Sequence, residues 1–114
     1  MNDALVAVLI GVVVFFALRV FFALRGRISS AEAHAKVVEG ALLLDVRTPG
    51  EFAAGALPGA MNIPVQSLAG RLGELEKDRP VVVYCASGMR SSRAAAMLRK
   101  HGIDAHDLGP ARAW

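Results

Sequence analysis

The only cysteine of the chain, Cys85, lies in a stretch that could do nucleophilic chemistry. It follows the β-favouring run "VVVY" and precedes "ASGMRSS", small or flexible residues that include Arg90. A thiol attacks as the thiolate, which is stabilised at a helix amino end and beside a cation. A helix beginning near Ser91 would direct unpaired N–H groups at the loop, and Gly88 would let several amides converge. The pattern predicts a cup for an anion with sulfur at its base. The alternative is a buried cysteine acting as a small apolar residue.

The segments around this loop predict a small parallel α/β domain. Continuous apolar runs at residues 41–46 and 80–85 are typical of strands buried on both faces. A further strand is expected at 103–108, and a short extended piece at 60–63. Helical patterns separate these runs, as in parallel sheets, where ligands bind at the carboxyl ends of the strands. Cys85 occupies such an end.

Capping signals predict where the helices begin. Ser29 with Glu32, and Thr48 with Glu51, have the spacing of capping boxes. Apolar residues three or four positions apart between 65 and 75 predict an amphipathic helix, which is weakened by two glycines. The sequence therefore alternates strands and helices throughout the part that follows the amino-terminal segment.

Residues 4–24 form an apolar segment with a single charge, Arg19. As a helix it would extend roughly 31 Å, about the thickness of the hydrocarbon of a bilayer. A cleavable signal peptide and a buried helix of a soluble protein are the alternatives. A signal peptide fits poorly, because the chain begins "MND" without a basic residue and has no clear small-residue cleavage site. The segment predicts a single transmembrane anchor in contact with the lipid bilayer.

The basic residues near this segment predict its orientation. Arg19, Arg25 and Arg27 lie on its carboxyl-terminal side, and flanking arginines stay in the cytoplasm. A chain with one cysteine also suits a reducing compartment. We expect residues 1–25 to be an anchor in the cytoplasmic (inner) membrane and residues 26–114 to be a domain facing the cytoplasm.

Charge and histidine content exclude other classes of partner. The net charge is +3, but no run of basic residues with interleaved aromatics is present, so a nucleic-acid partner is not expected. The three histidines are too dispersed for a metal site: His34, His101 and His106. The sequence predicts no metal and no cofactor.

Three stretches resemble single-domain rhodaneses: "LLLDVRTPGEFAAGALPGAMNIP", "VVVYCASGMRSSRAAAMLRKHGI" and "DLGPARAW". The resemblance covers residues 28–114 and implies a rhodanese-like α/β fold with a small parallel sheet of about five strands, flanked by helices. It also implies a sulfurtransferase. Cys85 would attack the outer sulfur of a small anionic donor, thiosulfate or a persulfide. Sulfite leaves when the donor is thiosulfate, and a thiol or cyanide-like acceptor takes the sulfur from the Cys85 persulfide.

The same resemblance implies roles for individual residues. Cys85 and Arg90 would be catalytic, with Asp45 and Arg47 supporting them from the neighbouring strand end. The backbone that cradles the persulfide would be that of Ala86, Ser87, Gly88, Met89 and Arg90. The sequence departs from the family pattern in having Ala56 where histidine is frequent and Pro110 where a second glycine is usual, so the rim and the last turn are expected to differ in shape.

Other functions fit less well. Phosphatases and arsenate reductases of the related fold place five residues between cysteine and arginine, whereas four separate Cys85 from Arg90. The short loop favours sulfur over a tetrahedral oxyanion. A non-catalytic docking module at the membrane, with an incidental cysteine, is the alternative function, and redox use of the thiol also stays open.

Overall fold

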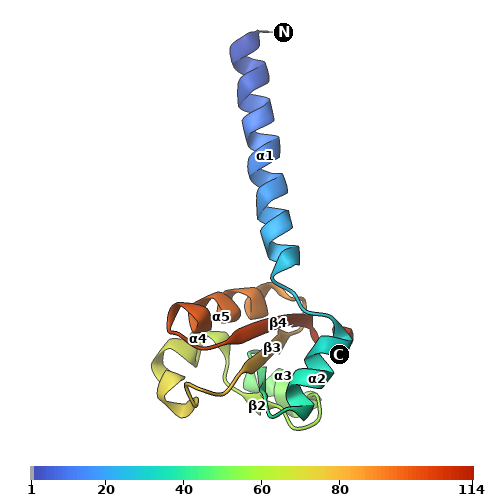
Figure 1. The fold of residues 1–114 in the computed structure, drawn as a ribbon, viewed down its shortest axis with the longest axis vertical. Helices are drawn as coiled ribbons and strands as arrows, with labels where there is room; N and C mark the ends of the chain where they lie inside the picture. The colour runs from blue at the N-terminus through green and yellow to red at the C-terminus, as the bar shows by residue number, and fades with distance from the viewer. Residues whose placement is uncertain (1) are drawn as a thin grey trace.

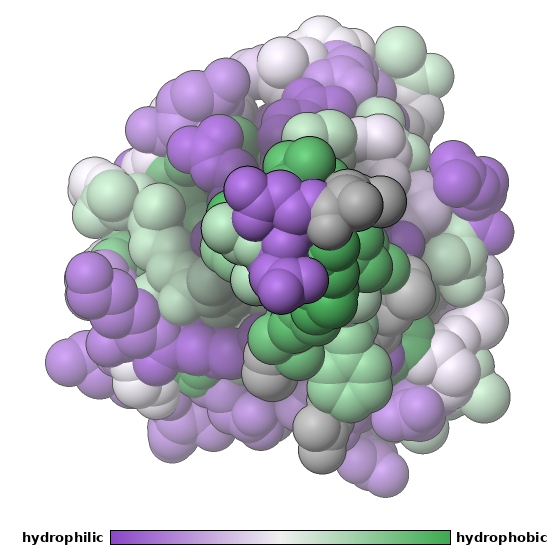
Figure 2. Space-filling view, turned by 90° about the horizontal axis from the view of Figure 1, so that it is seen from above, coloured by the Kyte–Doolittle hydropathy of each residue, from purple (hydrophilic) through white to green (hydrophobic). Residues whose placement is uncertain are grey.

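The amino-terminal helix stands apart from a small α/β domain in the computed structural model, which describes residues 2–114 except the side chains of residues 22–25 (Figure 1). Helix α1 spans Asp3–Arg25, and its stretch Asp3–Phe21 is long and apolar enough to cross a membrane. Figure 2, a view along the helix, shows apolar α1 in front of a mostly hydrophilic surface. The Arg25 side chain, predicted to flank the membrane, lies outside the described residues.

The sheet of the domain consists of parallel strands. They are β1 (Leu42–Asp45), β2 (Met61–Asn62), β3 (Val81–Cys85) and β4 (Ala105–Pro110), in the order β2-β1-β3-β4. All three neighbouring pairs are parallel, which confirms the predicted fold class. Strand β3, one of the two inner strands, is buried at every position, so its continuous apolar run is explained by contacts on both faces.

The prediction of about five strands is too high, because the described residues form four. Beside β4, where a fifth strand could pair, the chain makes only an isolated parallel bridge between Arg27 and Asp107. The capping box at Ser29 then starts helix α2 at Ser30 and turns the chain away from the sheet. A strong helix start two residues after the bridge leaves no room for a strand.

The helices begin where the capping signals predict. Both capping boxes are formed, with Ser29 and Thr48 as N-caps and Glu32 and Glu51 returning the second hydrogen bond. The helical segments of the domain are α2 (Ser30–Val38), α3 (Pro49–Ala54), α4 (Val65–Leu68), the 3-10 turn η1 (Ala69–Glu74), α5 (Met89–Lys100) and the 3-10 turn η2 (Ala111–Ala113).

Two helical predictions need correction. The amphipathic helix expected from residue 65 is α-helical for one turn and continues as η1, which contains Gly70 and Gly73. Glycine is a poor helix former, so the α-helix gives way to the tighter turn there. Helix α5 begins at Met89, two residues before the expected start near Ser91, because Gly88 takes up a left-handed conformation and ends the loop early.

Each face of the sheet has its own hydrophobic core. Helices α4 and α5 cover one face, where Leu98 of α5 packs with Leu44 and Val83. Helix α2 covers the other face, where Ala33 packs with Leu43 and buried Tyr84. Alternate residues of β3 therefore serve opposite cores, and Cys85, at its carboxyl end, packs in the core beneath α4 and α5.

Candidate active site

Cys85 is the last residue of β3, and its side chain is fully buried. Its Sγ accepts hydrogen bonds from the backbone N–H groups of Gly88, at 3.0 Å, and of Ser91, at 3.4 Å. Sulfur is a weak acceptor as a thiol and a good one as a thiolate. Two backbone donors therefore converge on this sulfur.

The loop between β3 and α5 is shaped by Gly88. This residue has φ +99°, a left-handed conformation that favours glycine, and it is the N-cap of α5. Met89 and Arg90 open the helix, so their N–H groups have no acceptor within it. Ala86, Ser87 and Met89 are exposed. The Met89 side chain, a large apolar group, is 77% exposed. The loop therefore offers backbone donors at a solvent-facing rim.

Ser91 was not among the site residues predicted from the sequence. It is fully buried, and its hydroxyl donates to the Gly88 carbonyl at 3.1 Å while its N–H contacts the Cys85 sulfur. The helix was predicted to begin near Ser91, but it begins at Met89, so Ser91 is the third helical residue. Its N–H therefore points into the loop, which the late predicted start did not reveal. The available signal was the glycine three residues earlier, a possible N-cap.

Arg90 is held by an acid from another helix. Its guanidinium donates to the Glu51 carboxylate at 2.7 and 3.0 Å. Glu51 was predicted only as the cap of α3. It caps that helix and also binds Arg90. The hydrogen bond from Arg90, followed by that from the Thr48 backbone, lowers the pKa of Glu51 from 4.5 to about 2. The same pairing raises the pKa of Arg90, to which the charge of Cys85 adds less. The arginine is thus a fixed cation in the electrostatic field of the sulfur.

Asp45 and Arg47 form an ion pair beside the loop that follows α3. The Arg47 Nη2 atom lies 2.7 Å from Asp45 Oδ2 and also donates to the Gly55 carbonyl at 2.7 Å. The guanidinium carbon lies 5.6 Å from the centre of the Tyr84 ring. These contacts support the residue that precedes Cys85. Among the described residues, no hydrogen bond joins the pair to residues 86–90, so its predicted support of the site is indirect.

Asp107 of β4 lies behind the loop and is 3% exposed. Its carboxylate accepts from the Gly109 N–H at 2.9 Å and also hydrogen bonds with Ser91. Burial raises the pKa of Asp107, an effect that these hydrogen bonds and the charges of Arg27 and Arg99 reduce. Asp107 thus lies beside Ser91, whose hydroxyl donates to the Gly88 carbonyl and whose N–H donates to the sulfur. No sequence pattern predicted a role for this acid.

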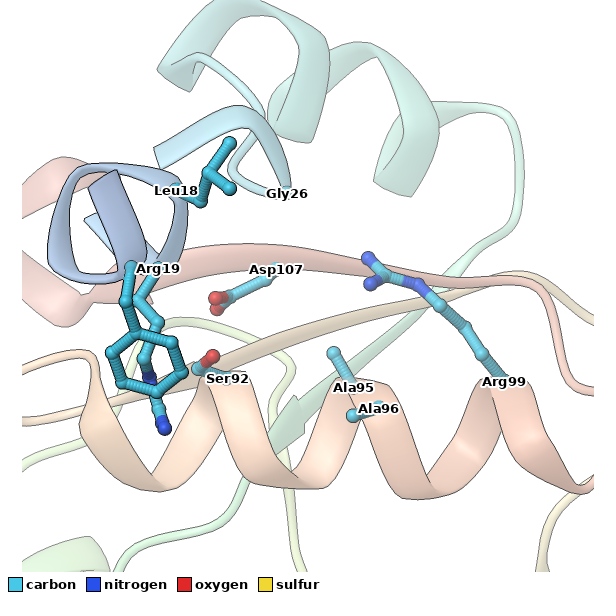
Figure 3. A pocket seen from close by; sticks show the side chains of 9 residues that line it. Leu18, Arg19, Gly26, Ser92, Ala95, Ala96, Arg99 and Asp107 are labelled. Carbon is cyan, nitrogen blue, oxygen red and sulfur yellow. The ribbon is translucent and has the colours of Figure 1, made fainter. Parts of the chain in front are cut away.

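A cavity of about 480 Å³ lies between the base of α1 and α5 (Figure 3). Figure 3 shows the Asp107 carboxylate pointing into it, with Ser92 on the facing helix. Cys85 is not among the residues that line it. The sulfur predicted to react therefore lies outside this cavity.

The family model of the rhodanese-like domain matches residues 29–109. The chain belongs to the rhodanese-like domain family. The resemblance predicted from the three sequence stretches is confirmed. The matched range includes the Cys85 loop, Asp45 and Arg47.

Relatives include enzymes named as sulfurtransferases. A "Sulfurtransferase" from Allochromatium vinosum is 47% identical over 56% of this chain and 60% of its own length. Thiosulfate sulfurtransferase GlpE of Pseudomonas entomophila is 38% identical over 68% of this chain and 71% of its own length. The first of these matches spans less than two thirds of the relative.

A solved structure shares the fold over the whole chain. A full-length protein from Lactobacillus plantarum is similar with a TM-score of 0.69 and 26% identity. That match covers 100% of this chain and 92% of the other. The similarity therefore extends over the amino-terminal helix as well as the domain.

Proposed function

We propose that this protein is a membrane-anchored sulfurtransferase that carries a sulfane sulfur as a persulfide on Cys85. The observation that carries the proposal is the pair of backbone N–H groups, from Gly88 and Ser91, on the sulfur of the only cysteine. The family membership and the sulfurtransferases among the relatives support it.

The reaction has two steps that balance without a cofactor. In the first, the Cys85 thiolate attacks the outer sulfur of thiosulfate, a sulfur–sulfur bond forms on the enzyme, and the donor bond breaks as sulfite leaves with its electron pair. In the second, a nucleophile such as cyanide or a thiolate attacks the outer sulfur of the persulfide. The Cys85 thiolate is regenerated as the leaving group.

The loop supplies the groups that this chemistry needs. The outer sulfur of the persulfide is anionic, and the helix-start N–H groups of Met89 and Arg90 are donors without an acceptor inside the helix. Arg90 stays beside the loop because Glu51 holds it. The exposed rim leaves the acceptor a path to the sulfur once the persulfide extends outward.

The amino-terminal helix would tether the enzyme to the cytoplasmic membrane, with the domain in the cytoplasm. Its apolar side chains are exposed along the described part of α1. Tethering would raise the effective concentration of the enzyme near a membrane-bound donor or acceptor. After expression of the full chain, the protein should stay with the membranes through an alkaline wash. Recovery in the soluble fraction would contradict the anchor.

The activity is tested with the full-length protein in detergent micelles, given thiosulfate and cyanide. Thiocyanate should form with the wild type and with Ser87→Ala, which changes an exposed loop residue and retains the backbone donors. It should not form with Cys85→Ala. Equal turnover by wild type and Cys85→Ala would overturn the proposal, and no turnover by either would favour a docking module.

A further inference from the structure

The segment between α1 and the domain reaches the sulfur-binding loop through Arg27. The Ile28 N–H donates to the Asp107 carbonyl at 2.9 Å, and Arg27 forms a parallel bridge with Asp107. The link out of α1 therefore lies along the outer edge of β4, as Figure 1 shows. This fixes the backbone of Arg27 beside the strand that carries the buried acid.

The side chain of Arg27 lies across two glycines of the site. A Cβ atom added at Gly88 would come within 3.0 Å of the Arg27 Cζ atom, and one added at Gly109 within 3.2 Å. Both glycines have positive φ, +99° and +87°. The absence of side chains at these two positions is what lets the guanidinium approach the backbone of the loop.

This guanidinium is close to the reacting sulfur. It lies beside Gly88, whose N–H is 3.0 Å from Cys85 Sγ. Standard bond lengths then place Arg27 Cζ within about 9 Å of the sulfur. Among the described residues, no hydrogen bond or salt bridge engages the Arg27 guanidinium, whereas Arg90 and Arg47 are paired with acids. The charge of Arg27 acts on the buried Asp107 carboxylate, whose pKa it lowers, and on the backbone of the loop beside it.

We propose that Arg27 is a positioning residue for Cys85, which clamps the Gly88 turn and provides a positive field for an anionic reactant at the sulfur. The proposal rests on the proposed function in that Cys85 is the reacting group. It also makes the junction between anchor and domain part of the site, because Arg27 lies two residues after α1 ends. The other arginine of the loop, Arg90, is committed to Glu51 and cannot take over this place.

The test compares the alkylation of Cys85 by anionic iodoacetate and by neutral iodoacetamide in the full-length protein in micelles. A loss of structure would change both rates together, whereas a loss of local positive charge lowers the ratio of the iodoacetate rate to the iodoacetamide rate. At about 9 Å, Coulomb's law gives a change of about twofold in a water-like medium and about 20-fold at an effective dielectric constant of 20. At low salt, the ratio for Arg27→Gln should therefore be lower than the wild-type ratio by a factor between about two and about 20.

Two further variants complete the test. Arg27→Lys keeps the charge and should keep the wild-type ratio. Arg79→Gln removes one arginine charge at the other end of β3, where Arg79 donates to the Gly40 carbonyl, and should also keep it. A wild-type ratio in Arg27→Gln, or an equal loss in Arg27→Lys, would overturn the proposal. Alkylation needs no sulfur donor, so this result is independent of the thiosulfate assay, whose failure would count against the sulfurtransferase function alone.

Discussion

Replacing Ser91 by alanine tests whether the buried serine holds the loop. The Ser91 hydroxyl donates to the Gly88 carbonyl at 3.1 Å and also interacts with the Asp107 carboxylate, whose pKa it lowers. Ser91→Ala leaves two buried acceptors with fewer partners. We expect the free energy of unfolding to fall by about 1–3 kcal/mol, the cost of a lost hydrogen bond plus a poorly satisfied buried group.

Ser92→Ala is the matched control. Ser92 is the next residue of α5, it is only half-buried, and no hydrogen bond of its hydroxyl occurs among the described residues. Both substitutions gain a similar amount of helix propensity, which cancels in the difference between them. Ser92→Ala should change the stability by about 0.5 kcal/mol or less.

The assay is thermal unfolding of the full chain in micelles, followed by the fluorescence of Trp114, the only tryptophan. For a domain of this size, each kcal/mol lowers Tm by about 4–8 °C. The thiosulfate kcat/KM of Ser91→Ala should fall about fivefold. A displaced Gly88 N–H would weaken its hydrogen bond to the sulfur and remove about 1 kcal/mol of transition-state stabilisation. Equal Tm and equal kcat/KM for the two variants would refute the idea that Ser91 positions the loop.

Two other substitutions test the buried charges. Burial raises the pKa of Asp107 above 3.8, so the folded protein binds this proton more tightly than the unfolded chain does. Wild-type stability therefore falls when the proton is lost as the pH rises above about 4. An asparagine side chain does not titrate, so Asp107→Asn should become more stable relative to wild type over the same pH range. Urea unfolding of both proteins across pH 4–7 measures this difference, and a constant or reversed difference would contradict it. Arg47→Ala should cost about 3 kcal/mol or more, because fully buried Asp45 is left without its partner. An unchanged urea midpoint would show that the pair contributes nothing to stability.

The parts of the fold that depend on neighbours in sequence could be predicted from it. Both capping boxes join residues three apart, and the burial of β3 follows from its unbroken apolar run. The carboxyl end of β3, at Cys85, could therefore be predicted from the sequence. The start of α5 was predicted two residues late because the conformation of Gly88, rather than a side-chain cap, decides it.

The contacts that complete the site join residues far apart in the chain. Glu51 meets Arg90 across 39 residues, and Arg27 reaches Gly88 only because its segment lies along β4. These meetings depend on strand order and on the path of the linker, which local patterns do not encode. The same holds for Asp107, whose position beside Ser91 follows from the register of β3 with β4.

The most direct test of the central claim is the intact mass of the full-length protein after exposure to thiosulfate and removal of the excess. The wild type should gain one sulfur atom, about 32 Da, and lose it again when cyanide is added. Cys85→Ala should gain nothing. A wild type whose mass stays unchanged with thiosulfate and with small-molecule persulfide donors, or an equal gain by Cys85→Ala, would contradict a persulfide carried on Cys85.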